Sequence, residues 1–146
     1  MHCCQYYMAT GDGDPSFTVD VPQFTFGAGC LAESGAHAKG LGLKRVALFT
    51  DPRVARLPHI DTVRKSLTSA GVDCAIYDEV TVEPTDASLK AAAKFASAGK
   101  FDGFVSVGGG SVMDTCKAAN LYATYPADFL AYVNAPIGGG QPVPGP

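Results

Sequence analysis

The sequence predicts an α/β protein built around a parallel sheet. Three short apolar stretches, at 45–51, 73–78 and 101–107, alternate with segments whose apolar residues recur at helical spacing. Strands that alternate with helices of about ten or more residues are typical of βαβ units, which give parallel strands and right-handed crossovers. Ligands of such sheets bind at the carboxyl ends of the strands. The residues that directly follow each stretch are therefore the first candidates for a binding site.

Composition and charge exclude several classes of function. At 146 residues the chain is long enough for one domain with its own core. A net charge of −3 provides no basic face for a nucleic acid, and no apolar run is long enough to span a bilayer. The five cysteines are odd in number and scattered, which is typical of a reducing compartment. We expect a cytoplasmic protein, or a mitochondrial one if the source is eukaryotic, with neither nucleic acid nor membrane as a partner.

The first residues are expected to carry no chemistry. Residues 1–15 are predicted to form a disordered leader, so that His2 and its neighbouring cysteines do not make a metal site. The leader lacks the basic start and long apolar core of a secretory signal, and it contains no arginine. Segments 17–21 and 23–26 alternate apolar and polar residues on either side of Pro22, which predicts a short β-hairpin or a broken edge strand.

The first strand of the sheet lies between two predicted helices. One helix is expected over 30–39 and ends at Gly40, a residue typical of helix ends. The stretch 45–51 predicts a compact buried strand that finishes on a polar pair. The second helix begins near Pro58 and ends before Gly71. One face of this helix is apolar and consists of Ile60, Val63, Leu67 and Ala70.

The next strands and helix repeat this order. The stretch 73–78 predicts a short strand. Thr85 is a suitable N-cap for a helix over 86–98, which Gly99 stops. The stretch 101–107 ends in an apolar run and predicts a parallel strand that is buried on both faces.

The end of the chain is expected to be a linker. A helix is predicted over 112–122, and 128–133 is predicted to form one more short helix. Residues 134–146 are mostly glycine and proline, which suit neither a helix nor a central strand. We expect this segment to be a truncated linker that follows one α/β domain over 16–133.

The glycine loop after the third strand predicts a phosphate site. Gly108, Gly109 and Gly110 have no Cβ atoms, so the backbone can turn sharply and a ligand can approach its amides. Ser111 is expected to be the N-cap of the next helix, with Asp114 completing a capping box. The N–H groups at such a helix start bind phosphate readily. A nucleotide is therefore the first ligand to consider.

A second glycine motif competes for the same role. Residues 27–32 match the G-x-G-x-x-A dinucleotide pattern, and Asp51 follows at about the spacing of the acid that binds a ribose. The segment before this motif is polar and interrupted by Pro22, unlike a buried parallel strand. We therefore place the phosphate at 108–111 and interpret 27–32 as a tight turn into a helix.

The segment 108–117 resembles the GGGSxxDxxK signature of iron-containing (group III) alcohol dehydrogenases. The turn at 26–29, the strand end at 50–51 and the segment 80–85 resemble the family at matching places, so the resemblance covers about 20–146. It implies a Rossmann-like NAD-binding domain of the dehydroquinate synthase-like type. It also implies, in a full-length homo-oligomeric enzyme, a separate helical domain that holds a divalent metal, iron or zinc.

That metal domain is absent from this sequence. The family's metal ligands are an aspartate and three histidines, and neither their motifs nor the cofactor-contacting PTTxGTGSE segment is present. His37 and His59 lie in different segments and are expected to be surface residues. The resemblance therefore identifies an NAD-binding fragment of an enzyme, and the fragment itself is expected to be inactive.

A longer match, over 108–122 together with 128–130, 132–133 and 135–138, resembles the hydroxyacid–oxoacid transhydrogenase branch of the family. This branch implies that 4-hydroxybutyrate is oxidised to succinate semialdehyde while 2-oxoglutarate is reduced to 2-hydroxyglutarate. The alternative within the family is an iron-dependent, NAD-dependent alcohol or lactaldehyde dehydrogenase. The alternative outside enzymes is a nucleotide-binding fragment without catalysis.

The resemblance assigns cofactor contacts to eight residues: Asp51, Glu83, Gly108, Gly109, Gly110, Ser111, Asp114 and Lys117. The loop would bind the NAD diphosphate through N–H groups and the Ser111 hydroxyl. Asp51 would accept hydrogen bonds from the adenosine ribose and repel a 2′-phosphate, which favours NAD over NADP. The alternative for Asp51 is a cap at the start of the following helix.

The remaining polar residues near the loop have two interpretations each. Glu83 either approaches the adenine or is a solvated loop acid. Asp114 can cap its own helix and can face the nicotinamide, two roles that are compatible, and Lys117 pairs with it at i, i+3. Cys116 is expected to pack in the core rather than act as a nucleophile, because no histidine adjoins it in the sequence.

Overall fold

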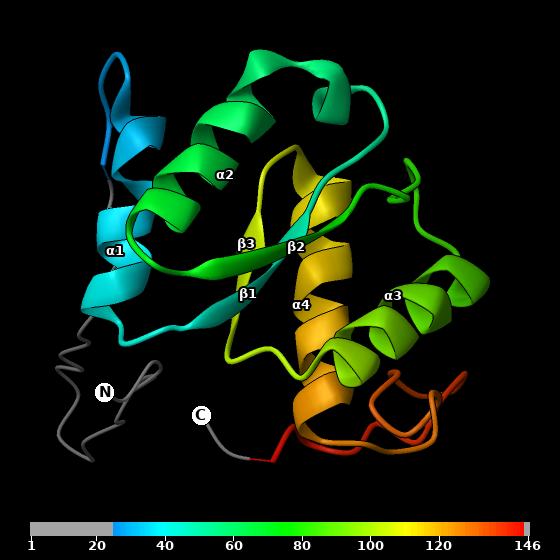
Figure 1. The fold of residues 1–146 in the computed structure, drawn as a ribbon. Helices are drawn as coiled ribbons and strands as arrows, with labels where there is room; N and C mark the ends of the chain where they lie inside the picture. Colours follow the sequence, from blue (N-terminus) through cyan, green and yellow to red (C-terminus); the bar gives the residue numbers. More distant parts are fainter. Residues whose placement is uncertain (1–24, 145–146) are drawn as a thin grey trace, which may run out of the picture.

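The computed structural model of the chain describes residues 25–144 (Figure 1). The predicted leader and the predicted strand at 17–21 lie outside the described residues, as do residues 23 and 24 of the segment 23–26. Residues 25 and 26 belong to no helix or strand. The elements are, in order, η1 (Cys30–Glu33), α1 (Ser34–Gly40), β1 (Arg45–Phe49), η2 (Val54–Arg56), α2 (Pro58–Ser69), β2 (Asp73–Tyr77), α3 (Asp86–Gly99), β3 (Gly103–Ser106) and α4 (Gly110–Thr124).

The sheet is parallel, as predicted, and has the strand order β2-β1-β3. The chain passes from β1 to the neighbouring β2 and then crosses to the other side of β1 to form β3. The strand order thus reverses between β1 and β3. In open α/β sheets the crevice at the carboxyl ends of two such strands is where ligands bind.

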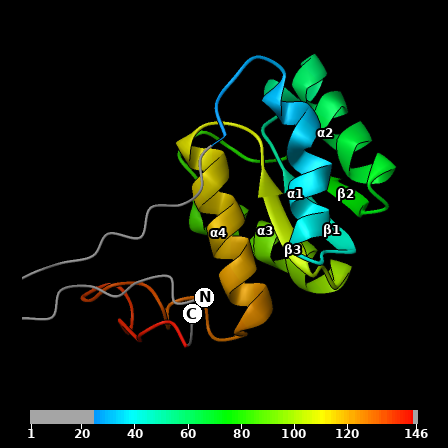
Figure 2. The same cartoon turned by 90° about the vertical axis from the view of Figure 1, so that its left-hand side faces the viewer.

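Helices cover both faces of the sheet (Figure 2). The central strand β1 has alternate side chains buried on opposite faces, because it has a strand on either side and helices above and below. Val46 and Leu48 pack with apolar residues of α1 and α2. Ala47 and Phe49 pack with the apolar faces of α3 and α4. The result is two separate hydrophobic clusters, one on each face of β1.

The helix starts follow local rules of capping. α2 has Pro58 at its first position, where a missing N–H costs nothing. The predicted cap at Thr85 is confirmed, since its Oγ1 accepts from the N–H of Ser88 at 3.2 Å. The Ser88 hydroxyl in turn accepts from the N–H of Thr85 at 2.9 Å, which completes a capping box.

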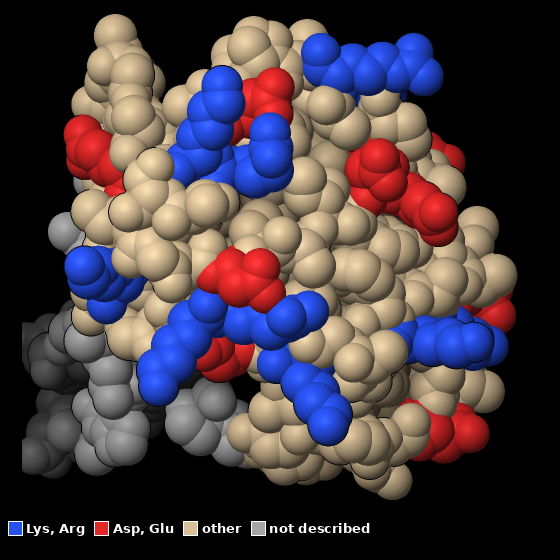
Figure 3. Space-filling model, viewed as in Figure 1, with Lys and Arg blue, Asp and Glu red and all other residues tan. Residues whose placement is uncertain are grey.

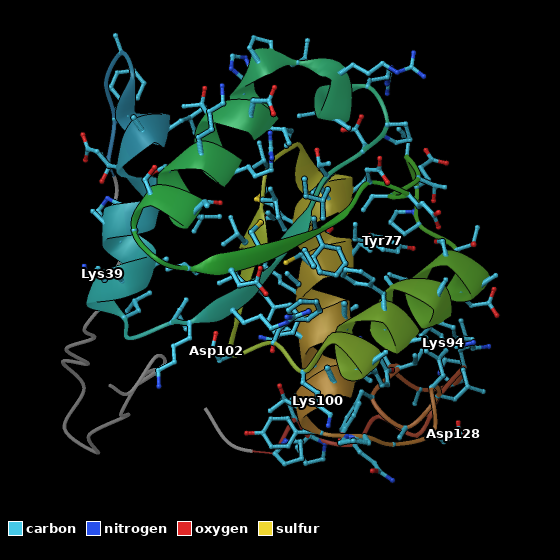
Figure 4. All side chains as sticks on the ribbon, viewed as in Figure 1. Lys39, Tyr77, Lys94, Lys100, Asp102 and Asp128 are labelled. Carbon is cyan, nitrogen blue, oxygen red and sulfur yellow. The ribbon has the colours of Figure 1, made fainter. Side chains whose placement is uncertain are left out.

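An acid joins the amino ends of two strands. Asp102 accepts from the N–H groups of Lys44 and Arg45 at 2.8 and 2.9 Å, and its carboxyl is marked at this end of the sheet in Figure 4. These bonds, that of Arg45 first, lower the pKa of Asp102 from its ordinary value. The Arg45 guanidinium then reaches Asp73 at the start of β2, at 2.6 Å. The amino ends of all three strands are thereby linked.

Two predictions about individual elements are wrong. The strand at 101–107 is shorter, and Phe104 and Val105 are only half-buried because β3 is an edge strand of the described sheet. The segment 128–133 forms turns instead of a helix. The Asp128 carboxylate accepts a hydrogen bond from the N–H of Leu130 at 2.9 Å. The N–H of Gly139 donates to the Leu130 carbonyl at 2.8 Å. A helix would need these same backbone groups.

No helix within residues 25–144 combines the length and the apolar character that crossing a bilayer requires.

The contact between α1 and α2 depends on a glycine. The Ser66 hydroxyl accepts from the N–H of Gly35 at 2.8 Å and donates to the carbonyl of Ala32 at 2.6 Å. A Cβ on Gly35 would lie 2.1 Å from the Ser66 carbonyl oxygen, which is backbone and cannot move aside cheaply. The two helices can therefore approach this closely only with glycine at position 35.

We expect Gly35→Ala to lower the free energy of unfolding by about 1–3 kcal/mol, although alanine favours a helix, because overpacking forces the two helices apart. Chemical denaturation measures this difference. Gly40→Ala is the matched control, since a Cβ there meets no atom within 4 Å and should cost nothing. Equal stability of the two variants would contradict the prediction.

Candidate functional site

The carboxyl ends of the three strands meet at Thr50, the residue that follows β1. Its N–H donates to the carbonyl of Tyr77 at the end of β2, at 2.9 Å. Its hydroxyl donates to the carbonyl of Val107, just after β3, at 2.8 Å. Its own carbonyl accepts from the N–H of Val80 at 3.4 Å. Thr50 is completely buried at this edge of the sheet.

The glycine loop connects the carboxyl end of β3 to the start of α4, at the same edge of the sheet as Thr50 (Figure 1). Its three glycines have different reasons to be glycine. A Cβ on Gly108 would lie 2.9 Å from the Val112 Cβ, so packing against α4 excludes a side chain there. A Cβ on Gly109 or Gly110 would meet no atom within 4 Å. Gly109 also has ordinary backbone angles, φ −85° and ψ −168°, so the fold requires glycine only at position 108.

The predicted cap at Ser111 is wrong. α4 begins at Gly110, its N-cap is Gly109, and no side chain caps it. The reason is that the carbonyl of Gly109 accepts from the N–H groups of Val112 and Met113, both at 3.1 Å, so Ser111 lies inside the first turn. Asp114 therefore does not complete a capping box with Ser111.

The start of α4 presents free donors. Among residues 25–144 no acceptor is recorded for the N–H groups of Gly109, Gly110 and Ser111. These groups lie at the positive end of a 15-residue helix. They stand beside glycines that leave open space for a ligand. The residues present therefore fit an anionic group such as a phosphate.

The Asp51 carboxylate caps the turn that leads into η2, whereas the N-cap residue of η2 itself is Arg53 and makes no side-chain cap bond. The Oδ1 of Asp51 accepts from the N–H groups of Arg53 and Val54 at 2.8 and 3.0 Å, ahead of η2. These bonds, that of Val54 first, lower the pKa of Asp51, so the carboxylate is ionised at neutral pH. The contact with a ribose stays a prediction, and the cap holds the carboxylate in a fixed position directly after β1.

The other predicted site residues lie at the surface. Glu83 is exposed in the loop after β2 and has a left-handed backbone, with φ 55°. Asp114 and Lys117 form the predicted i, i+3 pair at 4.0 Å, and their side chains are 74% and 78% exposed. An ion pair this exposed adds little stability, so both side chains are available for other contacts. Their roles toward a cofactor stay predictions.

Cys116 packs in the core, as predicted. It is buried with Val112 and Ala119 against the α3–α4 face of the sheet. Burial raises the pKa of the Cys116 thiol to about 11, so the thiolate is absent at neutral pH. Cys116 therefore has no nucleophilic character in this fold.

The second glycine motif forms a tight turn, as we interpreted it. The N–H of Cys30 donates to the carbonyl of Gly27 at 3.3 Å, and Gly29 is left-handed with φ 81°. The turn leads into η1, and no strand of the described sheet precedes it. The glycines of this motif therefore form a turn into η1, without the preceding strand that a dinucleotide-binding motif has.

The described residues do not fit the metal that the family resemblance implies. Within 25–144 no group of three or more His, Cys, Asp or Glu side chains could hold a metal ion. His37 is a surface residue of α1 whose Nε2 lies 3.8 Å from the carboxylate of Glu33 at the end of η1, and His59 is exposed.

Figure 3 shows acidic and basic side chains interspersed over the face in view.

Sequence reasoning missed the role of Thr50. It noted a polar pair at the end of β1 and assigned a function only to Asp51. The available signal was a hydroxyl residue directly after a strand that is apolar on both faces, where a buried polar atom needs a partner.

A family profile described as iron-containing alcohol dehydrogenase matches residues 22–145. Curated relatives include the mitochondrial hydroxyacid-oxoacid transhydrogenases of Mus musculus, 47% identical over 97% of this chain, and Homo sapiens, 49% identical over 89% of it. The chain spans 32% and 28% of the length of these two relatives.

Solved structures that resemble this chain include two dehydrogenases. The NADH-dependent butanol dehydrogenase A of Thermotoga maritima is 28% identical with a TM-score of 0.71, over 78% of this chain and 29% of that one. An alcohol dehydrogenase from Oenococcus oeni is 32% identical with a TM-score of 0.60, over 64% of this chain and 25% of that one.

Proposed function

This chain belongs to the iron-containing alcohol dehydrogenase family, and we propose that it is the NAD-binding part of a hydroxyacid–oxoacid transhydrogenase. One observation carries the proposal. Gly109 and Gly110, which the fold does not require, adjoin free N–H groups at the start of α4. The relatives that are 47% and 49% identical over most of the chain support the choice of this branch of the family.

The chain's own residues would bind and orient the cofactor. The N–H groups of Gly109, Gly110 and Ser111 would hold the diphosphate at the positive end of α4. Asp51, ionised and fixed by its cap, would accept from the adenosine ribose. Glu83 would approach the adenine side, and Asp114 and Lys117 would lie toward the nicotinamide. NAD supplies the hydride acceptor and donor when it is bound.

The proposed reaction is an exchange of hydride between two acids. A 4-hydroxyacid such as 4-hydroxybutyrate is oxidised to its semialdehyde, and 2-oxoglutarate is reduced to 2-hydroxyglutarate with the same two electrons. The described residues contain no cluster for a metal, so we derive no step through one. The names of the curated relatives place those proteins in mitochondria, which supports a mitochondrial location for this one.

A second candidate is an NAD-dependent alcohol dehydrogenase. The likeness to a butanol dehydrogenase, with a TM-score of 0.71, favours it. Both candidates use the glycine loop in the same way and differ in what reoxidises the cofactor.

We expect Gly109→Val to weaken NAD binding by at least about tenfold, because a side chain there would occupy the space beside the free N–H groups. The free energy of unfolding should stay the same, since that space is empty in the fold. Isothermal titration calorimetry measures the affinity. Gly40→Val, at an equally open position outside the loop, should bind NAD like the wild type. Unchanged affinity of Gly109→Val would contradict the placement of NAD.

Asp51→Asn should raise the affinity for NADP relative to NAD by roughly tenfold, because it removes a charge that repels the 2′-phosphate. Asparagine Oδ1 can still accept the two backbone bonds that form the cap, so the loop should stay in place. Titration with both cofactors gives the ratio. An unchanged ratio would show that Asp51 serves only as a cap.

The full-length protein that contains this chain should convert 4-hydroxybutyrate and 2-oxoglutarate into 2-hydroxyglutarate in repeated turnovers without added NAD. The reason is that one bound cofactor is reduced by the first acid and reoxidised by the second. Mass spectrometry of the products measures this. Turnover that needs free NAD and ignores 2-oxoglutarate would support the alcohol dehydrogenase instead.

A further inference from the structure

The buried hydroxyl of Thr50 has no part in the proposed binding of NAD described above. We propose that Thr50 is a positioning residue, whose hydroxyl fixes the direction of the first amide of the glycine loop. The inference rests on the proposed function in one respect, namely that the ligand of this loop is NAD. The positioning itself depends only on the hydrogen bonds of the described residues.

The peptide groups of Val107 are held from both sides by the end of β1. The Val107 N–H donates to the carbonyl of Phe49 at 2.9 Å. The Val107 carbonyl accepts from the Thr50 hydroxyl at 2.8 Å. Phe49, the last residue of β1, and Thr50, which follows it, thus bond to both peptide groups of Val107, at the point where β3 leads into the loop.

Thr50 is itself unable to move away from this contact. Its side chain has no exposed surface, and its N–H and carbonyl bond to Tyr77 and Val80 at 2.9 and 3.4 Å. These backbone bonds fix the Cα and Cβ of Thr50, and its complete burial limits rotation of the side chain, so the hydroxyl oxygen stays against the Val107 carbonyl. The direction from which it donates to Val107 is therefore fixed as well.

Peptide planarity carries this constraint into the loop. The carbonyl of Val107 and the N–H of Gly108 belong to one planar trans unit and point in opposite directions. Because Thr50 holds the carbonyl toward β1, the N–H of Gly108 must point away from β1. Among residues 25–144 no hydrogen bond is recorded for the N–H of Gly108 or of Gly109. The bond from Thr50 is therefore the last hydrogen bond that orients the chain before the free donors begin.

A second buried threonine shows that the role is specific to Thr50. The Thr115 hydroxyl donates to the carbonyl of Ser111 at 2.8 Å, one turn back in its own helix. The helix maintains that carbonyl without help from a side chain. The Thr50 bond instead joins segments that are 57 residues apart, across the crevice where the strand order reverses.

The test compares Thr50→Val, which keeps the shape and removes the hydroxyl, with Thr50→Ser, which keeps the hydroxyl. In the full-length protein that contains this chain, Thr50→Val should weaken NAD binding by roughly tenfold, because the loop amides lose their fixed direction. It should also speed amide hydrogen exchange at Val107 by roughly tenfold. Thr50→Ser should restore both values to within about twofold of wild type.

Thr115→Val is the matched control, a buried threonine nearer to the loop in sequence, and it should leave both readouts unchanged. If Thr50→Val does not fold, Thr50→Cys replaces it, since a thiol is only a weak donor. The proposal is overturned if Thr50→Val matches wild type, or if Thr50→Ser is as impaired as Thr50→Val. Absence of NAD binding in the wild type would remove the proposed function, while hydrogen exchange would still decide whether Thr50 positions the loop.

Discussion

The complete burial of β1 is the constraint on which the rest of the structure depends. Its last four residues have no exposed surface, and alternate side chains point into two different clusters. A strand of this kind has to lie in the middle of a sheet with helices on both faces. The Phe49 ring contacts both neighbouring strands: its centroid lies 5.1 Å from that of Tyr77 on β2 and 6.3 Å from that of Phe104 on β3. Figure 4 shows Tyr77 in this layer.

The candidate site exists because the apolar run of β1 stops where the strand order reverses. Thr50 is the first polar residue after that run, and its bonds bring the ends of β2 and β3 to one point. Asp51 then places a fixed carboxylate beside it. The glycine loop contributes the complementary charge, since α4 directs its unpaired N–H groups at the same edge. Packing explains Gly108, whereas a Cβ on Gly109 or Gly110 would meet no atom within 4 Å, so the fold leaves these two positions open.

Patterns of apolar residues were sufficient to predict most of the fold, because burial of one helix face or of a whole strand leaves a clear period in the sequence. What they could not predict were events decided by single backbone groups. The Gly109 carbonyl accepts the first hydrogen bonds of α4, so the helix starts before Ser111. The Asp128 carboxylate accepts the N–H of Leu130, and the segment forms a turn where a helix was predicted. The half-exposure of β3 depends on its place at a sheet edge, which spacing does not encode. Thr50 was missed because its partner is 57 residues away.

The helix α4 belongs to both the core and the candidate site, and it connects the site to residues at the opposite end of the helix. Its 15 residues span about 22 Å. Val112, Cys116 and Ala119 anchor the helix against β1, while the Tyr122 hydroxyl at its far end donates to the carbonyl of Phe129 at 2.5 Å. The turn around Phe129 therefore packs on the C-terminal end of α4, where the Phe129 ring also stacks on that of Tyr122. The Tyr122–Phe129 contact thus lies at the opposite end of α4 from the free N–H groups of the candidate site.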